Sequence, residues 1–199
     1  MNSTLTWTHA VTQTSNRVFA AMHTLKKLQH FLPRRVKLHL VRSLVFPFFH
    51  YCSAVINDMT GVLADKLQRS QNYCMRFVYD VRRDEHITPF YIQSNTLKLT
   101  DMRQIKLLTI LHTIMQTKFP KYFSDTFDFN SGRSAANTRS GSSVLRIPHH
   151  RTATYNKSFT VTACRLWNSL PASLTSIQSR PRFVGALKKH FYERMTVVG

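Results

Sequence analysis

Apolar residues recur every three or four positions through most of the first 119 residues, which is the spacing of one buried face of an α-helix. The first such series lies within residues 7–32 and consists of Val11, Val18, Met22, Leu25 and Leu28. Lys26 and Lys27 stand near its end, where positive charge suits the negative end of the helix dipole. The pattern predicts a first helix over residues 7–32.

A second helix is predicted from Pro33 to about residue 55, because proline is favoured in the first turn of a helix. Its expected inward face consists of Val36, Leu40, Val41, Leu44, Phe48 and Cys52. Pro47 lies inside this run. Proline lacks a backbone N–H and its ring clashes with the preceding turn, so we expect the helix to kink or split there.

Three more helices are expected before residue 120. A turn at residues 57–61 precedes a third helix at 62–81, whose inward residues are Leu63, Leu67, Cys74, Phe77 and Val78. Thr88 and Pro89 begin a short helix that ends near residue 94. Thr100 or Asp101 caps a longer helix that ends before Pro120 and turns inward Ile105, Leu108, Leu111 and Met115.

The pattern changes after Phe119. Residues 121–143 are rich in Ser, Asn and Gly without periodicity, as in a linker or a loop that orders on binding. Residues 144–159 alternate enough to predict one or two short strands, and two short helices are expected at 160–169 and 181–195. The sequence thus predicts a mainly α protein with a helical domain at 1–119, a linker at 120–143 and a basic segment at 144–199.

Charge adds a class of partner to this picture. The chain carries 28 Lys and Arg against 9 Asp and Glu, a formal net charge of +19. Such an excess opposes compaction unless a polyanion neutralises it. Nucleic acid is the first candidate, because phosphate contacts release counterions and reward clustered cations. An anionic membrane surface is the second, although no apolar run is long enough to span a bilayer and we expect no membrane partner.

The cysteines and the N-terminal residues indicate a compartment. Cys52, Cys74 and Cys164 are odd in number and widely spaced, which favours reduced thiols. The first ten residues lack the charged start and apolar stretch of a signal peptide. We therefore expect an intracellular protein, nuclear or cytoplasmic. A zinc site of Cys164 with His149 and His150 is disfavoured against a buried thiol and two solvated imidazoles.

Catalytic chemistry is not predicted. Two-metal phosphoryl transfer needs carboxylates that hold two cations about 4 Å apart. The adjacent pair Asp84 and Glu85 follows Arg82 and Arg83 at a helix end, where a solvated terminus is the simpler interpretation. Phosphate-binding glycine loops, nucleophile elbows and zinc-protease motifs are not found in the sequence. We expect no catalytic residues, no metal and no cofactor.

Two basic groups are the candidate nucleic-acid contacts. The first spans the junction of the first two helices and consists of Lys26, Lys27, Arg34, Arg35 and Lys37. Cations and helix-end amides at such a corner suit phosphate, although a solvated polar corner is an equal alternative. The second interleaves cations with an aromatic ring, which suits backbone contact and base stacking, and consists of Arg146, His149, His150, Arg151, Tyr155 and Lys157. An ordinary polar ribbon is the alternative there, and Trp167 is expected in the core.

Residues 5–192 carry a series of short sequence motifs, here called words, whose order resembles that in the C-terminal part of reverse transcriptases from non-LTR retrotransposons of the jockey type. The words of the first half are Leu5-Thr6-Trp7, Leu25-Lys26-Lys27-Leu28, Phe31-Leu32-Pro33, Ser43-Leu44-Val45-Phe46-Pro47, Tyr51-Cys52, Leu67-Gln68-Arg69-Ser70-Gln71-Asn72, Arg76-Phe77 and His86-Ile87-Thr88-Pro89. Those of the second half are Ile147-Pro148, Arg151-Thr152, Tyr155, Ser158-Phe159, Leu166-Trp167-Asn168-Ser169-Leu170-Pro171, Phe183 and Leu187-Lys188. No single word is specific; their order and spacing carry the resemblance.

The resemblance implies a helical thumb that grips a template–primer duplex, followed by a basic extension that helps to hold template RNA or target DNA. The fold class it implies is a thumb-like helical bundle, then a basic linker, a short β ribbon and two short C-terminal helices. The Ala-Asp-Asp turn of the family's RNA-directed DNA polymerase site has no match here, nor do the endonuclease, the fingers, the primer grip and the terminal zinc knuckle of some relatives. The chain is therefore expected to begin downstream of the palm, and the missing palm of a parent polymerase is a possible partner.

Two other interpretations stay open at this point. A non-enzymatic basic protein could use the same residues to bind RNA, chromatin or an acidic protein. Alternatively, the chain could come from a truncated copy of a retrotransposon that keeps these sequence motifs without having a selected function.

Overall fold

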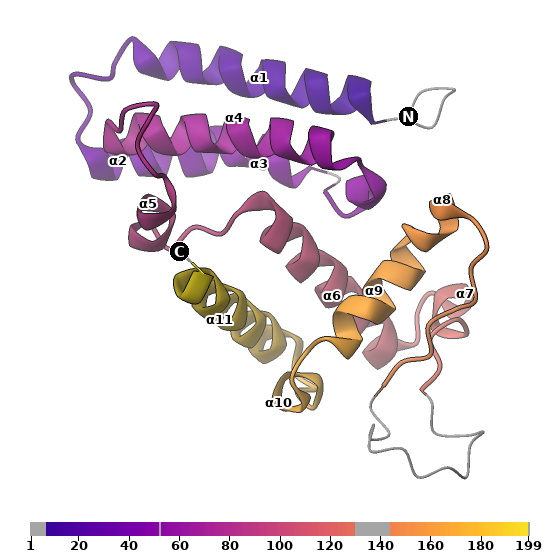
Figure 1. Cartoon of the computed structure of the whole chain (residues 1–199). Helices are drawn as coiled ribbons and strands as arrows, with labels where there is room; N and C mark the ends of the chain where they lie inside the picture. Colours follow the sequence, from indigo (N-terminus) through magenta and orange to yellow (C-terminus); the bar gives the residue numbers. More distant parts are fainter. Residues whose placement is uncertain (1–6, 52, 130–143, 199) are drawn as a thin grey trace. The chain divides into compact units, whose positions relative to one another are not determined.

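The structure, a computed structural model, describes residues 7–51, 53–129 and 144–198 (Figure 1). Its elements in order are α1 (Thr8–Lys26), α2 (Arg34–Leu40), the π-helix η1 (Val41–Val45), α3 (Phe46–His50), the 3-10 helix η2 (Val55–Asp58), α4 (Gly61–Tyr79), α5 (Thr88–Gln93), α6 (Leu99–Thr117), α7 (Lys121–Ser124), α8 (Ala153–Asn156), α9 (Phe159–Asn168), α10 (Ala172–Thr175) and α11 (Arg180–Val198). Within the described ranges no strand forms, and a single antiparallel bridge pairs Phe129 with Leu145. The predicted mainly α class is confirmed.

The chain divides into two compact units. Unit 1 contains the described residues of Met1–Met102 and Tyr192–Gly199, and unit 2 is Arg103–Phe191. This division falls inside α6 and α11. Most of the linker expected at 120–143 lies outside the described residues, so the predicted domain boundaries stay a prediction. Composition marks where helices end, whereas the division depends on which residues touch, and both long helices contribute to both units.

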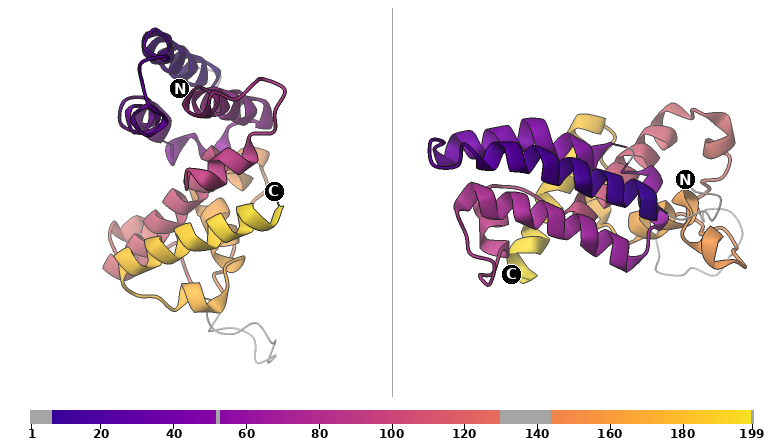
Figure 2. Two further views of the ribbon diagram at one scale, coloured as in Figure 1. Left: turned by 90° about the vertical axis from the view of Figure 1, so that its left-hand side faces the viewer. Right: turned by 90° about the horizontal axis from the view of Figure 1, so that it is seen from above.

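The core of unit 1 forms where α1 lies beside α4, as Figures 1 and 2 show. Val11, Val18, Met22 and Leu25 of α1 are buried there, as the periodicity predicts. Leu28 was expected on the same face but is 49% exposed, because α1 ends at Lys26 and the chain turns away.

The second predicted helix is one helical run whose middle widens into a π-helix. The N–H of Phe46 donates to the carbonyl of Val41, five residues back, and the next residue is Pro47, which has no N–H to donate. One extra residue in the turn rotates the following face by about 100°. After this turn Val45 and Phe49 are buried and Leu44 is exposed, so the prediction that Leu44 faces inward is wrong. Val36 lies in the first turn of α2, before the π-helix, and is also exposed, contrary to the prediction. Cys52 lies outside the described residues.

A buried polar network joins α4 to α5 and to the start of α6. Gln68 accepts a hydrogen bond from the N–H of Leu99 at 3.0 Å and donates to the Tyr91 hydroxyl at 3.0 Å. Gln71, which is fully buried, donates to the carbonyl of Leu97 at 3.1 Å. These amides satisfy backbone groups in the turn before α6, so α4 fixes the path of the chain there.

The last turns of α11 belong to unit 1. The Tyr192 hydroxyl donates to the carbonyl of Ile92 at 2.7 Å, and Arg194 forms an ion pair with Asp101 at 2.6 Å. Met195 is buried in the same core.

Unit 2 has its own core, in which aromatic rings from three helices meet. His112 of α6 stacks on Phe183 of α11 with ring centroids 4.2 Å apart, and Trp167 of α9 packs against Phe183 at 5.8 Å. His112 also hydrogen-bonds the carbonyl of Ile177 through Nε2 at 2.8 Å. Trp167 is 3% exposed, so its predicted place in the core is confirmed.

The β ribbon predicted at 144–159 is not found in that segment, whose β contact in the described residues is the bridge from Leu145 to Phe129. The side chain of Asn168 accepts from the N–H of Leu145 at 2.8 Å and donates to its carbonyl at 2.9 Å. Thr152 and Ser158 then cap α8 and α9 with their hydroxyl groups. The capped helix α8 thus forms, and the capped helix α9 begins, where the weak alternation of apolar residues predicted strands.

Candidate nucleic-acid interface

Four of the five cations predicted at the first junction lie exposed at the end of α1 and the start of α2. Lys26 and Lys27 end α1, and Arg34 and Arg35 begin α2. We call these four residues the basic corner. The loop between them is short and returns the chain beside α4, so the four charges gather at one end of unit 1.

Lys37, the fifth predicted contact, is placed differently. It is 4% exposed, and its ammonium lies 2.8 Å from both carboxylate oxygens of Asp80. Asp80 ends α4 in a left-handed conformation (φ 55°) and also accepts from Gln29 at 2.9 Å. Hydrogen bonding from Lys37 lowers the pKa of Asp80 below its ordinary value, with smaller contributions from Gln29 and Arg34. Lys37 is thus committed to the fold, and we leave it out of the proposed binding surface.

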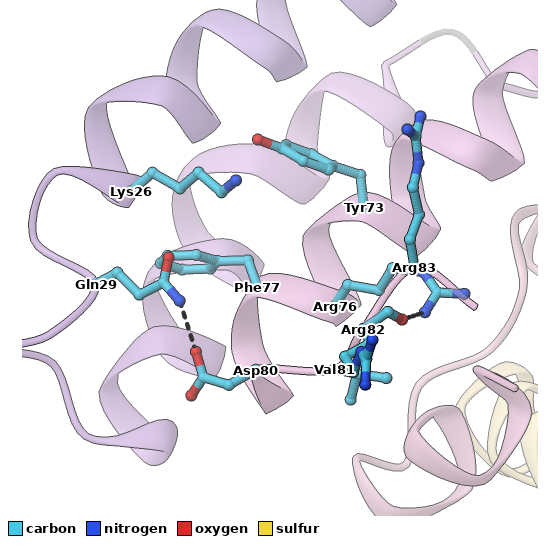
Figure 3. A pocket seen from close by; sticks show the side chains of 9 residues that line it. All are labelled: Lys26, Gln29, Tyr73, Arg76, Phe77, Asp80, Val81, Arg82 and Arg83. Carbon is cyan, nitrogen blue, oxygen red and sulfur yellow. Dashed lines mark hydrogen bonds between the residues drawn. The ribbon is translucent and has the colours of Figure 1, made fainter. Parts of the chain in front are cut away.

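A hollow of about 460 Å³ opens beside the basic corner (Figure 3). It lies between the end of α1 and the end of α4, and its lining residues are Lys26, Gln29, Tyr73, Arg76, Phe77, Asp80, Val81, Arg82 and Arg83. We call it the basic hollow. Four of its lining side chains are cationic, and its one carboxylate, Asp80, is already neutralised by Lys37. The hollow therefore presents net positive charge.

The structure places Arg82 and Arg83 in the candidate site, and the prediction from the sequence did not include them. The loop that carries them is held by Arg76, whose guanidinium donates to the carbonyls of Arg82 and, at 2.8 Å, of Glu85. Carbonyl oxygens are neutral, so Arg76 fixes the loop and keeps its charge. The adjacent arginines were visible in the sequence, but only the fold of α4 against α1 brings them to the basic corner.

Aromatic rings support the cations of this region. The Lys26 ammonium lies 5.3 Å from the centroid of the Tyr73 ring, and the Arg34 guanidinium lies 5.2 Å from that of Tyr79. Both distances fall within the roughly 6 Å of a cation–π contact. These contacts limit the positions of the two side chains without neutralising them.

The second predicted group lies in unit 2. Arg146, Arg151, Tyr155 and Lys157 are exposed on the segment between the Phe129–Leu145 bridge and α9. The structure adds Arg165, whose guanidinium lies 3.3 Å from Nε2 of His150. His149 is exposed and His150 half-buried. The first basic group thus belongs to unit 1 and the second to unit 2.

The adjacent acids Asp84 and Glu85 both contact Arg82 in the loop after α4. Glu85 accepts from the N–H of Arg82 at 3.1 Å, and Asp84 lies 3.7 Å from the Arg82 guanidinium. Among the residues that the structure describes, no three His, Cys, Asp or Glu side chains are grouped to hold a metal ion. No helix in the described ranges is long and apolar enough to cross a membrane.

Neither family models, nor curated proteins, nor solved structures match this chain. The resemblance to non-LTR reverse transcriptases therefore stays a prediction.

Proposed function

We propose that this chain binds nucleic acid through the phosphate backbone, with the basic corner and Arg82 and Arg83 as the principal contacts in unit 1. The observation that supports this most strongly is the charge of the basic hollow. Its carboxylate is paired with Lys37, while Lys26, Arg82 and Arg83 line the hollow together. Arg82 lies 3.7 Å from the exposed carboxylate of Asp84, so the charges of Lys26 and Arg83 remain in excess. Positive side chains gathered in excess of carboxylates raise the local potential and attract a polyanion.

Phosphate contacts of this kind position a protein on nucleic acid without reading its sequence. The residues of the basic corner are long, flexible cations, and no base-reading arrangement is needed for them to act. This fits the role that the resemblance implies, a non-catalytic thumb and basic extension that grips a template–primer duplex or template RNA. In unit 2, Arg146, Arg151, Tyr155 and Lys157 are proposed as a second contact surface.

The test is the salt dependence of binding to a short RNA–DNA hybrid, measured by fluorescence anisotropy. If about six phosphates are neutralised, log K should fall against log salt with a slope near −5, which is about a thousandfold loss of affinity for a fourfold rise in salt. A flat response would contradict the proposal. Pull-down after nuclease treatment separates the acidic-protein alternative, because a protein partner survives that treatment.

Paired variants locate the contact. The double variant Lys27→Ala/Arg35→Ala removes two exposed charges of the basic corner and should reduce the slope by about 2. The matched control Arg17→Ala/Arg69→Ala removes two exposed charges nearer the middle of α1 and α4. The control should change the slope by much less. Equal effects of the two doubles would show that total charge, and not the basic corner, sets the affinity.

A further inference from the structure

The basic hollow has an aromatic side as well as a cationic one. Tyr73 is half-buried and lines the hollow together with the buried Phe77 and the half-buried Val81. Phe19 packs against Tyr73 with centroids 5.4 Å apart and rings tilted by 57°. This packing fixes the orientation of the Tyr73 ring within the lining of the hollow.

The cation over this ring is exposed and, within the described residues, is held by a single contact, the one with Tyr73 itself. Lys26 ends α1 and is exposed, and its ammonium reaches the Tyr73 ring at the end of a flexible stem (Figure 3). Arg83 comes from the loop after α4 and is also exposed. In the described part of the chain, no carboxylate pairs with Lys26 or Arg83. Both side chains can therefore turn to an incoming phosphate, while Arg76 stays bonded to its two carbonyls.

The size of the hollow matches a small organic ligand better than a bare anion. Its volume of about 460 Å³ falls within the range of about 300–1,000 Å³ that small-molecule sites occupy. A phosphate ion would leave the aromatic side of this hollow uncovered. A nucleotide would use both sides, because its base has a face that stacks on an aromatic ring and its phosphate carries the charge.

We propose that the basic hollow receives a single unpaired nucleotide, with its base against Tyr73 and its phosphate between Lys26 and Arg83. This inference rests on the proposed function, since it assigns one specific ligand to a surface otherwise proposed for backbone contacts. The unpaired nucleotide can be the end of a strand or a free mononucleotide. A paired base cannot enter in this way, because its partner base holds it in the duplex and would have to enter the hollow with it.

The experiment compares two short RNA–DNA hybrids by anisotropy, one blunt and one with a single unpaired nucleotide that carries a 5′-phosphate. The full chain should bind the second about tenfold more tightly, as stacking of one base on an aromatic ring supports. Tyr73→Leu should abolish this preference, and Tyr73→Phe should keep it, because phenylalanine retains the ring. The control Tyr51→Leu, at a 78% exposed tyrosine outside the hollow, should leave it unchanged.

The outcomes separate this inference from the proposed function. Steep salt dependence with equal affinity for the two hybrids would overturn the inference and leave the proposed function standing. A preference that survives Tyr73→Leu would also overturn it. Loss of binding to both hybrids in the unaltered chain would overturn both. Adenosine 5′-monophosphate at millimolar concentration distinguishes the sources: removal of the preference assigns the site to the nucleotide itself, and an unchanged preference assigns it to a strand end.

Discussion

Replacing Asp80 with asparagine should destabilise unit 1, because it removes the carboxylate that neutralises a buried ammonium. Lys37 is 4% exposed and lies 2.8 Å from both oxygens of Asp80. Asparagine has nearly the same shape and tolerates the left-handed conformation found here, at φ 55°. Asp80→Asn thus removes the charge and leaves the backbone undisturbed.

The expected loss lies between two limits. Removing one partner of a fully buried ion pair costs about 3–5 kcal/mol, whereas an exposed pair contributes at most about 1 kcal/mol. The Lys37 side chain is buried and that of Asp80 is 50% exposed, so water screens one partner. We expect a loss of about 2 kcal/mol, which corresponds to about 30-fold faster exchange of amides that open with unit 1.

Hydrogen exchange of the full chain, read by mass spectrometry of peptides, measures this locally. Peptides from α2 and α4 should lose protection in Asp80→Asn, and peptides from α9 in unit 2 should not. The double variant Lys37→Met/Asp80→Asn should recover most of the loss, because it leaves no unpaired charge in the core. Unchanged protection in Asp80→Asn, or equal losses in the single and double variants, would refute this reasoning.

Three further outcomes are expected. The pKa of Asp80 is held below its ordinary value of 3.8, so the contribution of Asp80 to stability is complete above about pH 4 and is lost as the pH falls through the lowered value. Urea titrations at a series of acidic pH values should show this loss in the unaltered chain and not in Asp80→Asn. His112→Leu should cost about 1–3 kcal/mol in thermal unfolding, because the carbonyl of Ile177 loses its partner, and unchanged stability would contradict the hydrogen bond. Burial raises the pKa of the Cys74 thiol to about 12 and that of Cys164 to about 11, so iodoacetamide at about pH 8 should label both only after denaturation, as peptide mapping would show.

Helices were predictable from the sequence where the apolar residues keep the same helical spacing from one end of the helix to the other. The spacing of Val11, Val18 and Met22 predicted α1, and that of Leu108 and Leu111 predicted the inward face of α6. Prediction failed where a local bond competed with the pattern. The segment 144–159 alternates like a strand, but its polar groups are satisfied by Asn168 and by the caps of two helices, which alternation cannot reveal.

The candidate site was predictable only in part, for a similar reason. A count of charges identified the basic corner correctly as an exposed cluster but could not distinguish Lys37 from its neighbours. Its partner, Asp80, lies 43 residues along the chain and meets it only after α4 has packed beside α2. The same packing brings Arg82 and Arg83 into the lining of the hollow, and the sequence shows them only as a helix end.

The π-helix at Val41–Val45 has a consequence for comparing this chain with others. Relative to a continuous α-helix, it is equivalent to a one-residue insertion that the helix absorbs without forming a loop. Alignment with a protein whose helix is uninterrupted at this point requires a one-residue gap within 41–45. Search patterns built on a fixed helical period fall out of phase after residue 45, so similarity on the two sides of η1 has to be scored separately.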